Sequence, residues 1–133
     1  TRQMHLHIMD IRFNEKAPTI DEIHTLFKNE YGVAILWTAK GTKEVRDFAE
    51  STKFNFKDTN MLHIHANMTK SIDDTIQLMY SDDQTGIVIP ENHMLLQAML
   101  FQRDYNDAVK RTEKLFGMDE KKKLLEENFA KKD

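Results

Sequence analysis

The distribution of hydrophobic and polar positions predicts a chain in which short strands and helices follow one another closely. Over residues 4–13 the side chains alternate with a period near two, since His5 and His7 alternate with Leu6 and Ile8. This pattern is typical of a β-strand whose two faces meet different surroundings. We therefore expect the folded part of the chain to begin with a strand.

A helix is predicted next, because a capping box precedes a stripe of apolar residues at helical spacing. In this motif the Thr19 hydroxyl and the Glu22 carboxylate each accept a hydrogen bond from a backbone N–H group that has no partner inside the helix. Gly32 can adopt the left-handed conformation that ends many helices. The pattern predicts a helix over residues 20–31.

The middle of the chain favours three more strands and one helix. Residues 33–38 are apolar without alternation, which favours a strand that is covered on both faces and lies centrally in the sheet. A second amphipathic helix is predicted after Gly41. The strand-like runs 61–68 and 75–80 are separated by polar residues, so we expect them to pair as an antiparallel hairpin.

The last third of the chain predicts helices. Residues 87–89 form a short strand-like run before Pro90, and a helix is expected over 91–101 because proline is well tolerated where a helix starts. A further helix is predicted to begin after Asp104 and to end at Gly117, since these residue types favour the two helix ends.

Together these elements predict an α+β fold, with a mixed or antiparallel sheet, helices covering one face and C-terminal helices after it. Residues 1–118 would form the main unit. Residues 119–133 would form a charged helical extension, whose thin apolar stripe predicts that it frays or serves as a contact arm. The four glycines do not cluster, which argues against a P-loop and against the glycine-rich turn of a doubly wound nucleotide fold.

Composition narrows the classes of function. The 133 residues suit one domain, and a net charge of -3 provides no general attraction for nucleic acid or anionic membranes. The longest apolar run, 32–37, is too short for a spanning helix, and no signal sequence is recognisable. The absence of cysteine excludes disulfides and thiolate ligands and fits a reducing compartment. We expect a cytoplasmic protein that binds neither nucleic acid nor membrane.

Four of the six histidines form two His-x-His pairs, His5 with His7 and His63 with His65. A spacing of two on a strand places both rings on one face, so two adjacent strands could present four nitrogen atoms to a metal ion. No carboxylate or cysteine stands at a matching spacing, and histidines in strands more often bond to their neighbours. We assign no metal site from the sequence, and a metal-binding module built on these histidines stays an alternative.

Other chemistry-bearing residues give weaker signals. The acidic pairs 73–74 and 82–83 are interpreted as solvated turns rather than as an acid/base dyad. No serine or lysine has the surroundings of an activated nucleophile. An imidazole ordinarily titrates near neutral pH, so a histidine of either pair can act as a general base, but only beside a reacting partner. The residues taken alone therefore do not indicate an autonomous enzyme.

Four short motifs follow one another along the chain in a specific order. They are Met4-His5-Leu6-His7, Pro18-Thr19-Ile20-Asp21-Glu22-Ile23, Asp83-Gln84-Thr85-Gly86 and Ile87-Val88-Ile89-Pro90-Glu91-Asn92. Taken together, this series resembles archaeal-type (type II) phosphorylating glyceraldehyde-3-phosphate dehydrogenases. The resemblance covers about residues 1–118, which would be the C-terminal part of the catalytic domain of that family.

The resemblance implies an oxidoreductase of glycolysis or gluconeogenesis that converts glyceraldehyde 3-phosphate into 1,3-bisphosphoglycerate. In that family a cysteine thiolate adds to the aldehyde, a hydride passes to NAD or NADP, and phosphate releases the acyl group. By position His5 would be the catalytic base that activates the thiol. Gln84 falls on a family position that contacts the dinucleotide cofactor, and Asn92 is a second candidate because it lies close to Gln84 in sequence. His7 would contact the catalytic histidine rather than the substrate.

The chain also departs from the family pattern. The family's nucleophilic cysteine and dinucleotide-binding turn precede the region of resemblance, and neither is present. The chain would be about the last third of the enzyme and inactive alone. Asp82 or Asp83 stands where the family commonly has histidine, and the tail exceeds the usual family end. The intact enzyme would take a small phosphorylated aldehyde and would be a homo-oligomer, whereas the alternative is a standalone binding or oligomerisation module.

Overall fold

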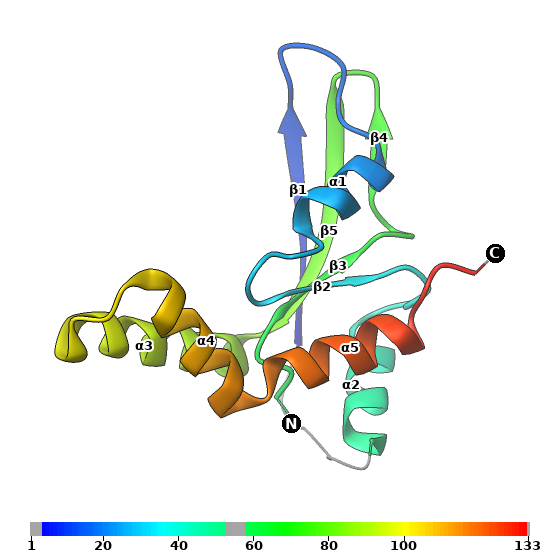
Figure 1. Cartoon of the computed structure of the whole chain (residues 1–133). Coiled ribbons are helices and arrows are strands. Elements are labelled where there is room, and N and C mark those ends of the chain that lie inside the picture. Colours follow the sequence, from blue (N-terminus) through cyan, green and yellow to red (C-terminus); the bar gives the residue numbers. More distant parts are fainter. Residues whose placement is uncertain (1–3, 53–57, 133) are drawn as a thin grey trace.

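The computed structural model describes residues 4–52 and 58–132. Within these ranges five strands form one mixed sheet and five helices pack around it or extend from it (Figure 1). This confirms the predicted α+β class with C-terminal helices. In chain order the elements are β1 (Met4–Arg12), α1 (Ile20–Phe27), β2 (Val33–Leu36), α2 (Thr42–Ser51), β3 (Leu62–His65), β4 (Lys70–Ile72), β5 (Thr75–Asp83), α3 (Gln84–Phe101), α4 (Tyr105–Phe116) and α5 (Met118–Asn128).

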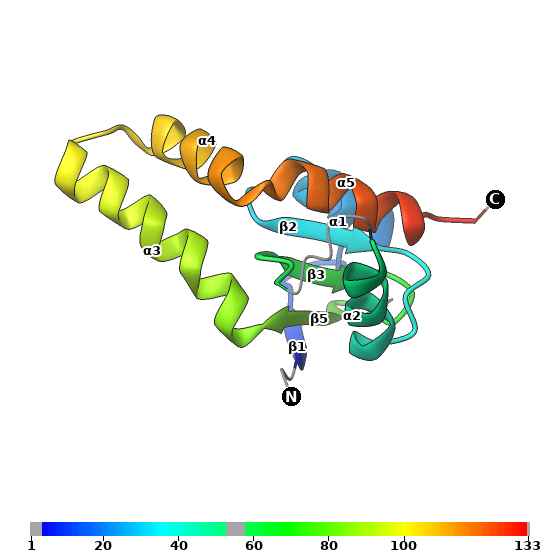
Figure 2. The ribbon, with the colours of Figure 1, turned by 90° about the horizontal axis from the view of Figure 1, so that it is seen from below.

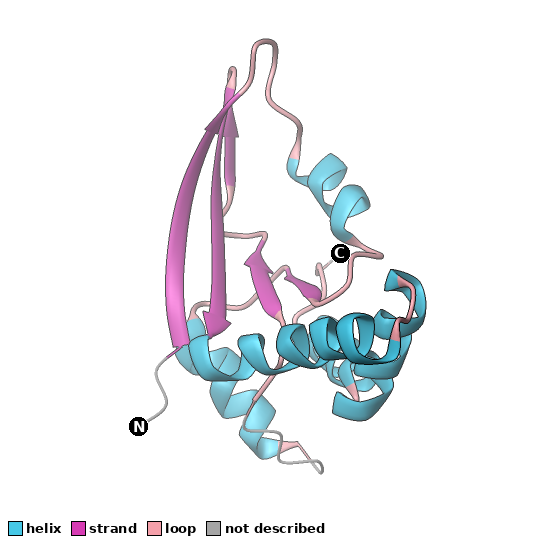
Figure 3. Ribbon diagram, turned by 90° about the vertical axis from the view of Figure 1, so that its left-hand side faces the viewer, coloured by secondary structure: helices cyan, strands magenta, loops and turns pink. Residues whose placement is uncertain are grey.

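The sheet has the strand order β1-β5-β3-β2, and the short strand β4 also pairs with β5. β1 and β5 are the long strands that lie side by side in Figure 3, and their antiparallel ladder runs from Met4 opposite Asp83 to Arg12 opposite Thr75. β5 also pairs antiparallel with β3, as predicted, but the two do not form the predicted hairpin, because β4 lies between them in the chain and forms the hairpin with β5. β2 and β3 are parallel, so the sheet is mixed.

The predicted turn at residues 73–74 is confirmed. Asp73 has a positive φ of 53° and stands between β4 and β5, a conformation that aspartate tolerates better than most residues. The Arg12 Nε group donates a hydrogen bond of 2.7 Å to the Asp74 carboxylate, which ties the end of β1 to this hairpin.

β2 is covered on both faces as predicted, but its predicted central position is wrong, because it lies at the edge of the sheet. The end of α5 covers this edge. The Glu126 carboxylate accepts a hydrogen bond from the Ile35 N–H group at 3.1 Å, and the Phe129 carbonyl accepts one from the Trp37 N–H group at 2.7 Å. An edge strand can therefore be continuously apolar here, since a helix and not another strand protects its free side.

The core has two parts, one on each face of the sheet, because successive strand residues point to opposite sides. On one face α1 packs against the sheet, with Ile23, Ile35 and Ile64 buried. On the other face α2 and α5 pack against the sheet, and the buried residues are Ala34, Leu36, Ala39, Val45, Ala49, Met61, Met118, Leu125 and Phe129. Helices therefore cover both faces of the sheet, and the prediction that helices cover one face is wrong.

The expectation that the segment after residue 118 frays is wrong. α5 begins at Met118 and lies along β2 (Figure 2). Leu125 is fully buried and Phe129 is 2% exposed. The buried apolar residues Met118, Leu125 and Phe129 are separated by seven and then four positions, and these spacings return to one face of a helix. A thin stripe is sufficient because each of its members enters the core.

The predicted strand over 87–89 and the helix start at residue 91 are also wrong, since α3 begins at Gln84 and continues through Pro90. A proline inside a helix leaves the carbonyl four residues earlier without its usual donor. That carbonyl belongs to Gly86, and the Asn60 Nδ2 group donates a hydrogen bond to it at 2.9 Å. The helix therefore passes through the proline with this backbone group satisfied.

α3 and α4 pack against each other and extend from the sheet as a helical pair (Figures 1 and 2). Apolar side chains of α3 are exposed on several sides, and Leu100 is 68% exposed. None of the helices in the described ranges, α3 included, combines the length and the apolarity that a bilayer crossing requires.

Candidate functional site

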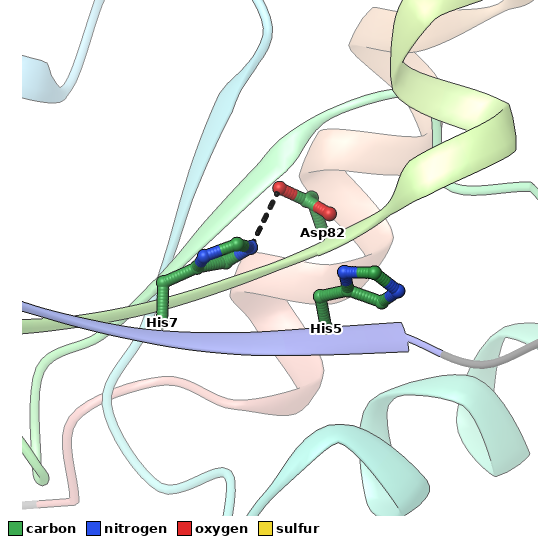
Figure 4. A group of neighbouring side chains, drawn as sticks. All are labelled: His5, His7 and Asp82. Atoms are coloured by element: carbon green, nitrogen blue, oxygen red, sulfur yellow. Dashed lines mark ion pairs between the residues drawn. The ribbon is translucent and has the colours of Figure 1, made fainter.

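Three polar side chains gather on one face of the β1–β5 ladder. His5 and His7 alternate with Leu6, so both rings point to the same side of the sheet. Asp82 is the register partner of His5 and therefore shares its face. Figure 4 shows the two rings on β1 and the carboxylate on β5 lying together. The sheet thus brings residues from distant parts of the chain into one polar cluster.

Stacking on Tyr80 orients the ring of His7. The centroids of these two rings are 4.8 Å apart with an interplanar angle of 11°, an offset or parallel contact that fixes ring orientation. The Nε2 atom of His7 lies 3.3 Å from the Oδ2 atom of Asp82. The His5 and His7 ring centroids are 6.0 Å apart. His5 is half-buried, so its ring is held by the sheet yet still reaches solvent.

The structure places the two predicted cofactor residues differently. Gln84 is exposed at the first position of α3, two residues after Asp82, and so lies at the same end of the sheet as His5. Asn92 is also exposed, but it stands eight residues further along α3, which corresponds to about 12 Å of helix. His5 and Gln84 are therefore brought to one region, and Asn92 lies beyond it.

The interpretation of residues 82–83 as a solvated turn is wrong, since both are part of β5. Asp83 is buried and caps α3, because its Oδ1 atom accepts hydrogen bonds from the Thr85 and Gly86 N–H groups at 3.1 and 3.2 Å. Asp82 instead faces the histidines, and its side chain is 17% exposed. The two neighbouring carboxylates have different roles because strand residues alternate between faces.

The second histidine pair lies on the opposite face of the sheet. His63 is paired with Ser81, which in turn is opposite Leu6, so His63 points away from His5. His63, His65 and Ser81 are fully buried. The Ser81 hydroxyl lies 2.8 Å from His65 Nε2 and 3.4 Å from His63 Nδ1. The alternative in which both pairs bind one metal ion is therefore contradicted by the register.

Burial keeps this second pair neutral. It lowers the pKa of His63 to about 3, with a further contribution from the neighbouring His65 ring, and it also lowers the pKa of His65. Both rings are hidden from solvent under α2 and α5. His63 and His65 therefore support the structure as hydrogen-bonded core residues.

The exposed cluster could support two kinds of chemistry. A half-buried imidazole such as His5, next to a carboxylate, could accept a proton from a reacting group brought to it. The same side chains offer nitrogen and oxygen atoms that suit a metal ion. The sequence reasoning missed Asp82 and Tyr80 as members of the site. No local signal extends the strand past Tyr80, because residues 81–83 are all polar, and it is the pairing with β1 that continues β5 to Asp83.

No protein-family model matches the chain. The chain is similar to the glyceraldehyde-3-phosphate dehydrogenase of Saccharolobus solfataricus, with 26% identity over 121 residues. The similarity covers 89% of this chain and 35% of the relative, so the chain spans about a third of the relative's length. The chain is therefore similar to part of a glyceraldehyde-3-phosphate dehydrogenase, in agreement with the family that its motifs resemble.

Proposed function

We propose that this chain is the C-terminal part of the catalytic unit of an archaeal-type phosphorylating glyceraldehyde-3-phosphate dehydrogenase, with His5 as general base. The observation that carries the proposal is the similarity to the Saccharolobus solfataricus enzyme, which extends over 89% of the chain. The ordered motifs support the subtype. The substrate of the intact enzyme would be glyceraldehyde 3-phosphate, and its product 1,3-bisphosphoglycerate.

The position of His5 suits a base that serves a group from another part of the protein. Its strand is held by a ladder of hydrogen bonds, and the Asp82 carboxylate lies on the same face. Next to a cysteine thiol, the His5 ring would take the thiol proton and stabilise the thiolate as an ion pair. This chain contains no cysteine, so the thiol has to come from additional polypeptide.

The exposed amide of Gln84 fits a contact with a nicotinamide cofactor. Its carboxamide can donate and accept hydrogen bonds, which matches the carboxamide of a nicotinamide ring. NAD or NADP supplies the hydride acceptor in this chemistry. Asn92, about 12 Å further along α3, would contact another part of the dinucleotide.

The exposed surface of α3 supports the need for more polypeptide. A helix that is apolar on all sides is normally buried, and contiguous exposed apolar patches commonly mark an interface. We infer that the remaining part of the enzyme covers this helix, and that the intact enzyme is a homo-oligomer. The exposed apolar side chains of α3 are Val88, Ile89, Leu95, Leu96, Met99, Leu100 and Phe101.

A chimera tests the proposal directly. The chain is fused to the N-terminal part of the Saccharolobus solfataricus enzyme, and oxidation of glyceraldehyde 3-phosphate is measured with phosphate and NAD or NADP. The fusion should turn over, whereas the 133-residue chain alone should not. His5→Asn should lower kcat by about 10²–10⁴-fold, the usual contribution of a positioned general base.

The alkylation rate of the catalytic cysteine provides a second measurement. His5→Asn should slow iodoacetamide modification at neutral pH, since the thiolate loses its imidazolium partner. His24→Asn is the matched control, because His24 lies on α1 against Trp37, outside the cluster. A folded chimera in which both kcat and alkylation are indifferent to His5→Asn would contradict the role of His5. Turnover by the chain alone would refute the fragment interpretation.

A further inference from the structure

A triad of possible metal ligands stands out in the described part of the chain. Among residues 4–52 and 58–132, His5, His7 and Asp82 are the one group of three or more histidine, cysteine or acidic side chains whose ligand atoms converge. These atoms all lie within 4.8 Å of one another. The sequence has no carboxylate at a matching spacing beside the His5/His7 pair, and the fold supplies one from β5.

We propose that His5, His7 and Asp82 bind one divalent transition-metal ion of the zinc type. In a tetrahedral zinc site with bonds of about 2.0–2.1 Å, neighbouring ligand atoms are about 3.4 Å apart. The Nε2 atom of His7 and the Oδ2 atom of Asp82 are already 3.3 Å apart. Rotation of side chains, without backbone movement, would bring the His5 ring to the same separation.

The backbone holds the ligands at a suitable spacing. His5 and His7 are two residues apart on one strand, and Asp82 is directly opposite His5 on the neighbouring strand. Register partners of this kind have Cβ atoms about 4.5–5.5 Å apart, so three side chains reach a common point above the sheet. Stacking on Tyr80 limits the orientations of the His7 ring, as partners outside the ligand set do in known metal sites.

The donor set selects the class of ion. Two imidazole nitrogens and one carboxylate suit zinc, nickel or copper, whereas magnesium and calcium prefer sites made of oxygen atoms alone. Three protein ligands also leave one position of a tetrahedron for water or another molecule. The side chains of His7 and Asp82 are partly exposed, at 39% and 17%, whereas the Nε2 atom of His7 is itself buried, so an ion has to pass the exposed edge of the cluster to reach it.

Metal binding would also affect the proposed reaction. An ion on His5 would occupy the lone pair that the general base needs, so the metal should inhibit the intact enzyme. This consequence rests on the proposed function, but the binding itself does not. The binding test therefore uses the 133-residue chain without any activity measurement, so that its failure and the failure of the proposed function are distinguishable.

Isothermal titration of the metal-free chain with ZnCl₂ tests the proposal. We expect one ion per chain and an upward shift of the melting temperature, because an ion that binds the folded state stabilises it. His7→Ala and Asp82→Asn should each raise Kd by roughly 100-fold, since changes to the outer partners of metal ligands already cost about 10–100-fold. His24→Ala should leave stoichiometry and Kd unchanged.

Nuclear magnetic resonance of the histidine rings keeps the test decisive if a variant fails to fold. In the unaltered chain Zn²⁺ should shift the ring signals of His5 and His7, and should leave those of the buried pair His63 and His65 in place. Absence of one-to-one uptake by the unaltered chain would overturn the proposal. The proposal would also be overturned if folded His7→Ala and Asp82→Asn bound the ion as tightly as the unaltered chain does. The same holds if His24→Ala lost as much affinity as these two variants.

Discussion

The burial of α5 and of α3 is the opposite of what their compositions predict. Seven of the eleven residues of α5 are charged, yet its Leu125 is fully buried. α3 has one acidic residue and no lysine or arginine among eighteen residues, yet its Leu100 is 68% exposed. The comparison teaches that apolar content does not decide burial. What decides it is whether each apolar side chain has a surface within reach to cover.

α5 is buried because it closes an open part of the sheet. Its apolar residues enter the core beside α2, where the rings of Phe48 and Phe129 meet edge to face at 5.6 Å. Its polar groups are also used, since Glu126 accepts from the Ile35 N–H group at the free edge of β2. Packing and edge protection therefore act on the same helix, and both depend on residues that are remote in sequence.

Among the described residues, α4 is the helix that packs along α3. The His93 Nδ1 atom lies 2.8 Å from the buried Thr112 hydroxyl. The other sides of α3 carry exposed leucine, methionine and phenylalanine. Such a surface is expected where another part of a protein docks, which agrees with the proposal that the rest of the enzyme covers it.

Truncation of one leucine in each helix gives the largest expected difference. Leu125→Ala should lower the free energy of unfolding by about 2–5 kcal/mol, the usual cost of emptying a buried leucine site. Leu100→Ala should change it by less than about 0.5 kcal/mol, as is typical of surface positions. Urea unfolding of the two variants, followed by circular dichroism, measures both values.

Leu125→Met is the milder variant if Leu125→Ala does not fold, because it conserves most of the volume and should cost less than about 1.5 kcal/mol. Equal destabilisation by Leu125→Ala and Leu100→Ala would show that the two helices contribute alike, and would break the comparison.

Local signals in the sequence were sufficient for several elements. The capping box places the start of α1 correctly, since Thr19 Oγ1 accepts from the Glu22 N–H group and the Glu22 carboxylate accepts from the Thr19 N–H group. Alternation predicts β1, and Gly117 ends α4 with a positive φ of 61°. These features depend on residues within four positions of one another, so the pattern alone is informative.

The missed features depend on distant partners. The continuation of α3 through Pro90 needs the side chain of Asn60, which is 26 residues before Gly86. The polar cluster needs the register that sets Asp82 opposite His5, and a shift by one residue would turn it to the other face. Neither partner is visible in a local pattern, so the sequence predicted His5 as a site residue but not its surroundings.

A polar link between the two compared helices gives the next largest effect. Asn60 donates to the Gly86 carbonyl of α3, and its Oδ1 atom accepts from the Lys121 ammonium of α5. Asn60→Gly should lower the free energy of unfolding by about 1–3 kcal/mol, because a buried carbonyl loses its donor. Glycine is the suitable replacement, since Asn60 has a positive φ of 62°.

A double-mutant cycle with Pro90→Ala isolates this link. Alanine restores a backbone N–H group that can donate to the Gly86 carbonyl, so Asn60→Gly should cost less in the Pro90→Ala background. Urea unfolding of the four proteins provides the coupling free energy. Identical costs of Asn60→Gly in both backgrounds would show that the asparagine does not compensate for the proline.

The smallest predicted effect is a pH dependence of stability. It comes from His63, on the face of the sheet that α5 covers. Burial lowers the pKa of His63 to about 3, while the neighbouring Asp83 acts in the opposite direction, and the unfolded value is near 6.5. The unfolded state therefore binds more protons below pH 6.5. The contribution of neutral His63 to the free energy of unfolding should be fully present well above that pH. It should decrease as the pH falls, by about 1 kcal/mol between pH 7.5 and 5.5 for one such histidine.

His63→Gln removes this titration and keeps a polar side chain at the position. The free energy of unfolding of the variant should therefore depend less steeply on pH than that of the unaltered chain, while the two dependences should coincide above pH 7.5. Hydrogen exchange should locate the acid effect in β3, which carries His63, and in α5, which covers the same face of the sheet, and should leave unchanged those amides of α3 that exchange by local opening. An equal slope in both proteins would mean that His63 becomes protonated without unfolding, and then the core beneath α5 would be less closed to water than its burial implies.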